Sequence, residues 1–472
     1  MSIIRLQPRQ VRPERLWPAP IEKWYNHPVH PVADTSSCEG LKRVLGRWDL
    51  TAVGVNQVIG GAVFALPAAL AATAGAWSPW MVAVVGLASM LIALSFAEVA
   101  SRFDGTGGPY LYTRAAFGRF AAFEVGWMQW FTRASSWAAV VSVLVSSLGF
   151  YWPGATATAP RAVLTTLIIA FIAAVNVSGI RQSSLVVNLL TLGKLLPLAL
   201  FIVAGLWFVD WTRLTAPARM SVADLSSSAL LLVYAFGGYE VIPVVAGETR
   251  NPRRDVPFAL IMTILVVTCV TTLAQVVSIG TLPTLAASTT PLADAAAHFM
   301  GAGGAAMITL AAVLSTSGNN MGQALSGSRN LFALAEQKDL PALFGRIHPT
   351  LRTPVNAILV TAAVALALAL SGSFQLLAAA SAISRLLVYV ATCAATLRLR
   401  HPQFTSIVKP AVFVVRGGPV IPLAAILVAL AILAGASPLQ LASGTTALVA
   451  GAGLYLIAVK RPAGDRVAVT QR

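Results

Sequence analysis

The sequence predicts an all-α polytopic membrane protein with about twelve transmembrane helices. Of its 472 residues, 57% are hydrophobic and only 11% are charged, whereas soluble domains carry about 25% charged residues. Long uncharged stretches such as residues 259–292 recur along the chain, and about 20 apolar residues suffice to cross a bilayer as a helix. These stretches lack the in–out alternation of a membrane barrel, which favours helices over strands.

The predicted spans follow one another with short connections. We expect them at residues 49–73, 79–100, 120–148, 161–178, 185–208, 226–248, 257–281, 304–330, 353–371, 375–397, 419–436 and 441–459. The chain then divides into an N-terminal arm at 1–48, a transport core at 49–400 with the first ten spans, the last two spans at 401–460, and a tail at 461–472. The arm is polar, basic and Pro-rich and lacks the apolar core of a signal peptide, so we expect a loosely ordered cytoplasmic arm.

The distribution of Lys and Arg predicts the orientation. Basic residues gather in the arm, in alternate loops and in the tail, whereas the loops near 74–78, 282–303, 372–374 and 437–440 contain none. Cytoplasmic loops carry the excess of Lys and Arg. We therefore expect a multi-pass protein of the cell (inner) membrane with both termini cytoplasmic.

The charge and the cysteines exclude several other classes. The net charge of +16 lies beside spans, where it would face anionic lipid, so we expect no nucleic-acid partner. Cys38, Cys269 and Cys393 are far apart, with neither metal-ligand spacing nor an even count, so we expect no disulfide framework, metal or other cofactor. The spans hold no His-rich cluster or paired acids for catalysis, so we do not expect an enzyme.

Two spans contain a glycine pair near the middle. Gly60–Gly61 lies in span one, and Gly237–Gly238 lies in span six. Each span opens a block of five, and the two blocks would have opposite topology, as in an inverted repeat. A helix that unwinds at such a pair exposes N–H groups on one side and C=O groups on the other, which suit a carboxylate and an ammonium group. The alternative is that the pairs only permit close helix packing.

Several motifs resemble those of the amino acid, polyamine and organocation (APC) superfamily of permeases. They are the segment 96–118 after span two, Gly179–Arg181 and Lys194–Pro197 around span five, Gly247–Pro257 after span six, and Arg352–Pro354 before span nine. The resemblance covers residues 49–400. It implies a five-plus-five inverted repeat (LeuT-like) in which helices 1 and 6 are discontinuous.

The resemblance also implies a substrate site at the two breaks. The substrate carboxylate would lie against the backbone of Gly60, Gly61, Ala62 and Val63. The amino group would meet carbonyls near Ile59, Tyr234, Ala235 and Gly237, with Tyr234 or Phe236 as an aromatic lid. One departure is that the family usually has Gly-Ser/Thr-Gly in span one where this chain has Gly60-Gly61-Ala62, so a hydroxyl contact is missing.

Ionisable residues within spans are costly, so they are functional candidates. By resemblance to proton-coupled relatives, Lys194 would occupy the place of a sodium ion and exchange a proton; the alternatives are that it reaches the membrane boundary or permanently bonds span-one carbonyls. Glu240 would sense pH or balance a cation, or bond within the scaffold. Arg133 and Arg385 are expected to be structural partners of carbonyls or of each other; the alternative is contact with the substrate.

The hydroxyl and amide side chains of span eight are further candidates for an ion or proton site. They could instead bond their own helix. They are Ser315, Thr316, Ser317 and Asn319.

Together these features predict a secondary active transporter that takes up a neutral amino acid with protons by alternating access. Its partners would be the amino acid, protons and membrane lipid. The glycines at 61, 237 and 238 leave room for a side chain, and no second acid is evident for a second ammonium group. The alternatives are an amino acid or amine exchanger, a polyamine or organocation permease, and a non-transporting nutrient sensor.

Overall fold

The computed structural model describes residues 41–148, 152–215, 221–371, 374–436 and 438–460. Within these residues the chain is helical and contains no strand, apart from an isolated parallel bridge between Leu45 and Thr249. Most of the predicted arm, the predicted tail and Cys38 lie outside the described residues.

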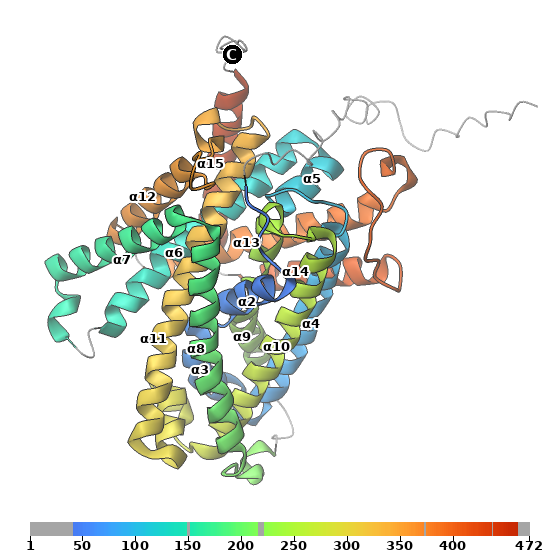
Figure 1. Ribbon diagram of the computed structural model, residues 1–472. Helices are drawn as coiled ribbons and strands as arrows, with labels where there is room; N and C mark the ends of the chain where they lie inside the picture. The colour runs from blue at the N-terminus through green and yellow to red at the C-terminus, as the bar shows by residue number, and fades with distance from the viewer. Residues whose placement is uncertain (1–40, 149–151, 216–220, 372–373, 437, 461–472) are drawn as a thin grey trace, which may run out of the picture.

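The described helices follow the predicted spans closely (Figure 1). In chain order the α-helices are α2 (Arg47–Val58), α3 (Gly61–Ala74), α4 (Ser78–Ala100), α5 (Pro109–Phe117), α6 (Arg119–Leu148), α7 (Thr158–Ser178), α8 (Ile180–Leu206), α9 (Val222–Phe236), α10 (Pro252–Thr281), α11 (Pro291–Glu336), α12 (Val355–Ser371), α13 (Phe374–Leu399), α14 (Val420–Ala434) and α15 (Pro438–Lys460). The 3-10 helices are η1 (Gly75–Trp77), η2 (Pro153–Thr156), η3 (Trp211–Leu214), η4 (Tyr239–Glu248), η5 (Leu285–Ala287), η6 (Ala342–Gly345) and η7 (Pro402–Phe404).

The helices present apolar side chains outward, as expected where lipid rather than water surrounds them. Five helical stretches of the described chain are long and apolar enough to cross a membrane, and three more are apolar but shorter. Leu167 and Phe171 on α7 and Leu427 on α14 are more than half exposed. Polar side chains such as Lys194 and Glu240 are instead buried inside the bundle.

The structure differs from the prediction at the start of span eight and by one additional short helix. Span eight was expected at 304–330, but α11 begins at Pro291, so the predicted loop 282–303 holds η5 and the first turns of α11. The early turns escaped prediction because Asp294 and His298 make them polar, and Gly301, with φ of +67°, bends the chain before the apolar part. The structure also contains α5, which is too short to be a span.

Spans one and six are both interrupted. Span one consists of α2 and α3, separated at Ile59 and Gly60. Span six consists of α9 and the 3-10 helix η4, separated at Gly237 and Gly238, so the predicted α-helix at 226–248 is α-helical only in its first part. Pro243 lies inside η4 and removes a donor from an α-helical ladder there.

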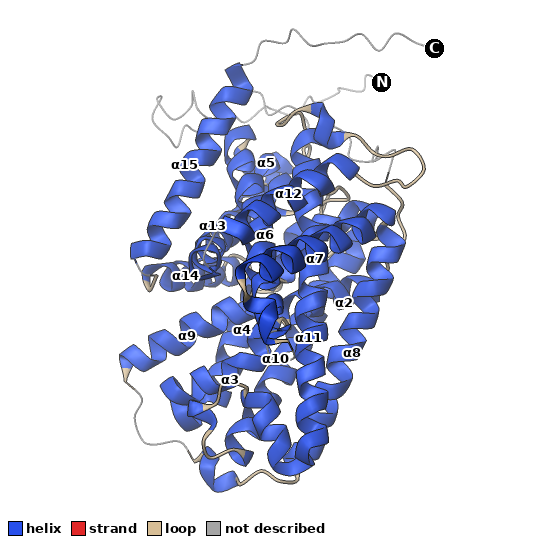
Figure 2. Ribbon diagram, turned by 90° about the vertical axis from the view of Figure 1, so that its left-hand side faces the viewer, coloured by secondary structure: helices blue, strands red, loops and turns tan. Residues whose placement is uncertain are grey.

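The interrupted helices lie inside the bundle. Helix α2 packs against α8, α10 and α11, and α3 packs against α9 and α11 (Figures 1 and 2). We call the end of the bundle with the start of α2, the start of α10 and the segment 400–419 the basic face, because Arg43, Arg250 and Lys409 lie there. The end with η1, η3 and η5 is the opposite face.

Candidate functional site

The break in span one is held by donors from two other helices. The helical ladder of α2 stops at Val58, and the Ile59 backbone (φ −75°, ψ 75°) turns its carbonyl out of the helix. Lys194 on α8 donates from Nζ to the carbonyl oxygens of Asn56 (3.0 Å) and Ile59 (2.5 Å). The Ser315 hydroxyl on α11 also donates to the Ile59 oxygen (2.8 Å). The end of α2 is therefore joined to α8 and α11.

Lys194 is completely buried. Its ammonium group lies 3.3 Å from the Ser315 hydroxyl in addition to the two carbonyls, and no carboxylate pairs with it in the described part of the chain. The alternative that Lys194 reaches the membrane boundary is therefore wrong, and the bonds to span-one carbonyls are present. A buried cation whose described partners are neutral oxygens is costly.

Helix α11 also clamps the turn before the break. The side-chain amide of Asn319 donates to the backbone carbonyl of Gln57 (2.8 Å), and the side-chain amide of Gln57 donates to the backbone carbonyl of Asn319 (2.9 Å). Asn56 donates to the Gly318 carbonyl (2.5 Å). Thr316, by contrast, bonds carbonyls of its own helix.

The break in span six depends on glycine for its backbone shape. Gly238 has φ of +135°, which L side chains rarely adopt. A Cβ added there would lie 2.8 Å from the Gln57 carbonyl oxygen, so the two breaks touch at this point. The Gly238 N–H donates to the Glu240 carboxylate (2.8 Å). A Cβ at Gly237 would collide with the Arg385 guanidinium group.

Glu240 is the centre of a buried ion cluster. Its carboxylate pairs with Arg133 on α6 and with Arg385 on α13 (2.8 Å), and it accepts from the Tyr389 hydroxyl (2.8 Å). All of these side chains are buried. The expectation that the two arginines pair with carbonyls or with each other is thus replaced by a shared carboxylate. Two cations and one anion leave the cluster with an excess of one positive charge.

A chain of polar contacts joins this ion cluster to the first break. Arg133 donates to the Gln323 side chain (3.1 Å), and Gln323 donates to the Asn319 side chain (3.2 Å). Asn319 in turn bonds the Gln57 carbonyl. Residues of α2, α6, α11, α13 and η4 are therefore connected without interruption.

Both breaks open onto one cavity of about 360 Å³. Its polar and backbone lining consists of Gln57, Gly60, Gly61, Ser136, Gly237, Thr316, Asn319, Gln323 and Arg385. Its apolar lining consists of Val58, Leu66, Ala69, Val140, Val143, Leu231 and Ala235. The volume lies within the usual range for small-molecule sites. Arg385 is the one charged residue among these described lining residues.

The cavity lies between two differently built ends. Its lining extends from the breaks toward the opposite face, to Ala69 on α3, Val143 on α6 and Leu231 on α9. Toward the basic face, Glu248 and Arg329 form a fully buried ion pair (2.9 Å) between η4 and α11. This pair lies near the basic face, because Glu248 precedes Arg250 by two residues.

The predicted site residues divide into three groups. Gly60, Gly61, Ala235 and Gly237 line the cavity. Val63, Phe236 and Glu240 are buried but do not line it, and the Ile59 carbonyl already accepts two bonds. Tyr234 and Ala62 lie in helices whose backbone is described, but their side chains lie outside the described residues.

Three polar lining residues escaped prediction, namely Gln57, Ser136 and Gln323. Each lies near other polar residues of a predicted span. Polar side chains gathered within a membrane span are the signal that could have identified them. Within the described residues, no group of three His, Cys, Asp or Glu could hold a metal ion.

The sequence is similar to known transport proteins over most of its length. Residues 45–459 match the family model described as amino acid permease. The branched-chain amino acid permease BcaP of Bacillus subtilis is 29% identical over 69% of this chain and 74% of its own length. The serine/threonine exchanger SteT of the same organism is 29% identical over 74% of this chain and 81% of its own. The methylthioribose transporter of that organism is 25% identical over 72% of this chain and 78% of its own length.

Proposed function

This chain belongs to the amino acid permease family, and on that premise we propose that it takes up a neutral amino acid together with protons by alternating access. The family is one of transporters rather than enzymes, and its members are multi-pass membrane proteins. The observation that supports the proposal most strongly is that two interrupted helices meet at one cavity. Interrupted helices supply backbone groups for a zwitterion inside a membrane.

The substrate would lie across the two breaks. Helix α3 begins at Gly61, so its first backbone N–H groups have no acceptor within the helix and suit the α-carboxylate. Helix α9 ends at Phe236, so its last carbonyls, near Tyr234 and Ala235, suit the α-ammonium group. The Ile59 carbonyl is the weaker candidate for the ammonium group because it already accepts two bonds.

The charge and polarity of the cavity favour a neutral side chain. Arg385 would repel a cationic side chain, and no acidic residue belongs to the described lining. Leu66, Ala69, Val140 and Val143 supply an apolar wall for an uncharged side chain. This favours a neutral amino acid over arginine or a polyamine.

We propose that the basic face is cytoplasmic, since Lys and Arg are enriched on that side of membrane proteins. Residues 49–400 would then form two five-span repeats of opposite topology, with α2–α3 and α9–η4 as the equivalent discontinuous helices. The cavity would face the cell exterior in this conformation, with the Glu248–Arg329 pair closing the inner side.

Lys194 is the proposed coupling group. Its proton supports the hydrogen bonds that hold the Asn56 and Ile59 carbonyls at the end of α2. Loss of that proton would remove a charge and a donor from this end, which forms one edge of the substrate cavity. Protonation and the shape of the cavity are thereby linked, as coupled transport requires.

The test is uptake into liposomes by the purified protein, with and without an inward proton gradient. We expect the gradient to stimulate uptake of labelled neutral amino acids, and Lys194→Ala to reduce that stimulation about tenfold or more. Lys42→Ala removes an exposed lysine and serves as the control. Retained exchange in preloaded vesicles would show that Lys194→Ala is folded.

Two results would contradict the proposal. Uptake that requires preloaded amino acid and ignores the gradient would identify an exchanger, as the name of the relative SteT describes that protein. Binding of an amino acid without any flux would identify a sensor.

A further inference from the structure

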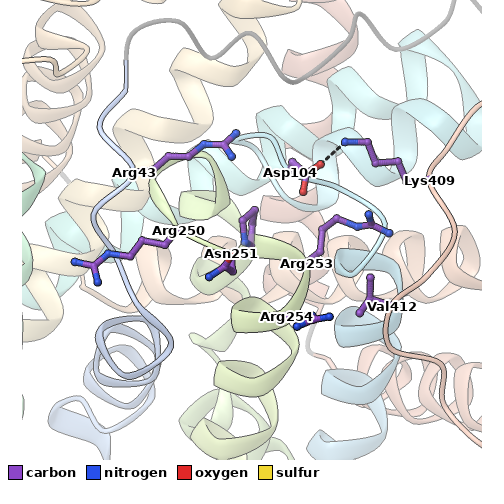
Figure 3. A pocket seen from close by; sticks show the side chains of 9 residues that line it. Arg43, Asp104, Arg250, Asn251, Arg253, Arg254, Lys409 and Val412 are labelled. Carbon is purple, nitrogen blue, oxygen red and sulfur yellow. Dashed lines mark hydrogen bonds and ion pairs between the residues drawn. The ribbon is translucent and has the colours of Figure 1, made fainter.

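A second cavity, of about 460 Å³, lies on the basic face, away from the proposed substrate site (Figure 3). Five cationic side chains and one acid line it: Arg43, Arg250, Arg253, Arg254, Lys409 and Asp104. They come from four separate segments, namely the residues before α2, the loop after α4, the start of α10 and the segment after η7. The fold therefore gathers this charge into one pocket.

Most of the charge in the pocket is not neutralised. Asp104 pairs with Lys409 (2.6 Å), and Arg253 donates to the carbonyls of Ser101 (2.8 Å) and Pro410. Arg43, Arg250 and Arg254 make no ion pair with any residue in the described part of the chain, and all three are exposed. Five cations and one acid leave an excess of four positive charges.

Arginine groups arranged in this way suit a phosphate. The guanidinium fork binds two phosphate oxygens at once, and a concave site of one sign of charge concentrates the opposite ion. Figure 3 shows the Arg43 side chain extending toward Asp104 and Lys409, whereas that of Arg250 extends away from them. In this view the cationic groups are spread over the pocket rather than gathered at one point.

The pocket also has an apolar border. Val412 lines the pocket and is 49% exposed. Val414, in the same segment, is 61% exposed. Exposed valines beside a cationic pocket, at the end of a membrane bundle, match a molecule that joins an anionic head to apolar chains.

We propose that this pocket binds a phosphate-bearing anion, with the headgroup of an anionic phospholipid as its source. A bound phosphate would touch both sides of a backbone junction. The backbone N–H groups of Val44 and Leu45 donate to the Glu248 carbonyl (both 3.0 Å), and the backbone N–H of Arg250 donates to the Leu45 carbonyl (2.9 Å). Arg43 precedes this junction and Arg250 belongs to it, so the anion would hold the start of α2 against the start of α10.

The experiment measures lipid retained by the full-length protein in detergent, by native mass spectrometry after incubation with phosphatidylglycerol or phosphatidylcholine. The pocket variant is Arg43→Gln/Arg250→Gln/Arg254→Gln. The control variant, Lys42→Gln/Arg346→Gln/Arg416→Gln, removes three exposed charges that do not line the pocket. Elution volume in size-exclusion chromatography checks that both are folded, and the single variant Arg254→Gln replaces the triple variant if that one is misfolded.

We expect retention of phosphatidylglycerol to weaken about a hundredfold in the pocket variant, about fivefold for each arginine removed, and to change little in the control. An equal loss in both variants, or retention of phosphatidylcholine to the same extent, would overturn the proposal. Displacement of the lipid by millimolar glycerol 3-phosphate would assign the site to free phosphate compounds and overturn the lipid source. The readout is binding, so failure of transport would not affect it.

Discussion

The two helix breaks face the same cavity but are stabilised in opposite ways. In span one, the backbone carbonyls of Asn56, Gln57 and Ile59 accept hydrogen bonds from Lys194, Ser315 and Asn319. In span six, Glu240 supplies the acceptor for the Gly238 N–H and is itself held by two arginines. One break depends on a cation that has no carboxylate partner among the described residues, and the other depends on an ion cluster.

The difference indicates a division of roles. The break in span six is held by an ion cluster in which Glu240 contacts two arginines. The break in span one is held by a cation whose hydrogen-bond partners among the described residues are neutral oxygens. We infer that span six orients the substrate and that span one responds to the gradient. Four substitutions test this comparison, from the largest expected effect to the smallest.

Glu240→Gln should have the largest effect. It leaves Arg133 and Arg385 buried without an anion, and removal of one partner from a buried cluster costs about 3–5 kcal/mol. We expect a marked fall in the thermal unfolding temperature and in uptake. Asp210→Asn, which removes an exposed acid on the opposite face, is the control. A Glu240→Gln protein as stable as the wild type would show that the cluster is not what holds this break.

Gly238→Ala should come next. The backbone φ of +135° and the nearby Gln57 carbonyl oppose any side chain, and such strain costs about 1–3 kcal/mol. We expect weaker substrate binding with a folded protein, measured by equilibrium binding in detergent. Gly303→Ala is the matched control, since a Cβ there meets open space. Equal substrate binding by both variants would contradict the proposal that the break at Gly238 shapes the substrate site.

Arg385→Gln should change selectivity more than stability. Glu240 keeps Arg133, so one cation and one anion remain paired. The cavity loses its charged lining residue, and removal of a like charge should raise lysine uptake relative to leucine by about tenfold. Competition of unlabelled lysine with labelled leucine measures this ratio. An unchanged ratio would mean that Arg385 does not set the charge preference.

Ser315→Ala should have the smallest effect. The Ile59 carbonyl loses one of its two donors but keeps Lys194, and one neutral hydrogen bond is worth about 0.5–1.5 kcal/mol. We expect gradient-stimulated uptake to fall by less than about tenfold. A loss as large as that of Lys194→Ala would mean that Ser315 controls the break in span one as much as the lysine does.

The sequence predicts the elements better than their contacts. The span expected at 120–148 is α6 (Arg119–Leu148), and the helices are interrupted at both glycine pairs. These features could be predicted because the hydropathy of a segment and the backbone freedom of glycine are local properties of the sequence. The sequence also singled out Lys194, Glu240, Arg133 and Arg385 as buried charges. The sequence did not show which of these residues pair. The contact of the Glu240 carboxylate with Arg133 and Arg385 depends on how three helices that are distant in the sequence pack together.

Other features escaped prediction because hydropathy alone does not carry them. Pro243 lies inside η4, and Asp294 and His298 make the early turns of α11 polar. Ser136 and Gln323 line the cavity only because of the helices that lie opposite them.

The backbone junction of Leu45 with Glu248 and Arg250 has a consequence for how this protein is made. Its two sides are about 200 residues apart, and synthesis at about 5–20 residues per second separates them by roughly 10–40 s. During that time the first span sits in the bilayer with its edge unpaired, and Lys194 reaches its carbonyls only once α8 has been inserted. The cavity therefore cannot be complete until span six, which supplies Ala235 and Gly237 to its lining, has been inserted.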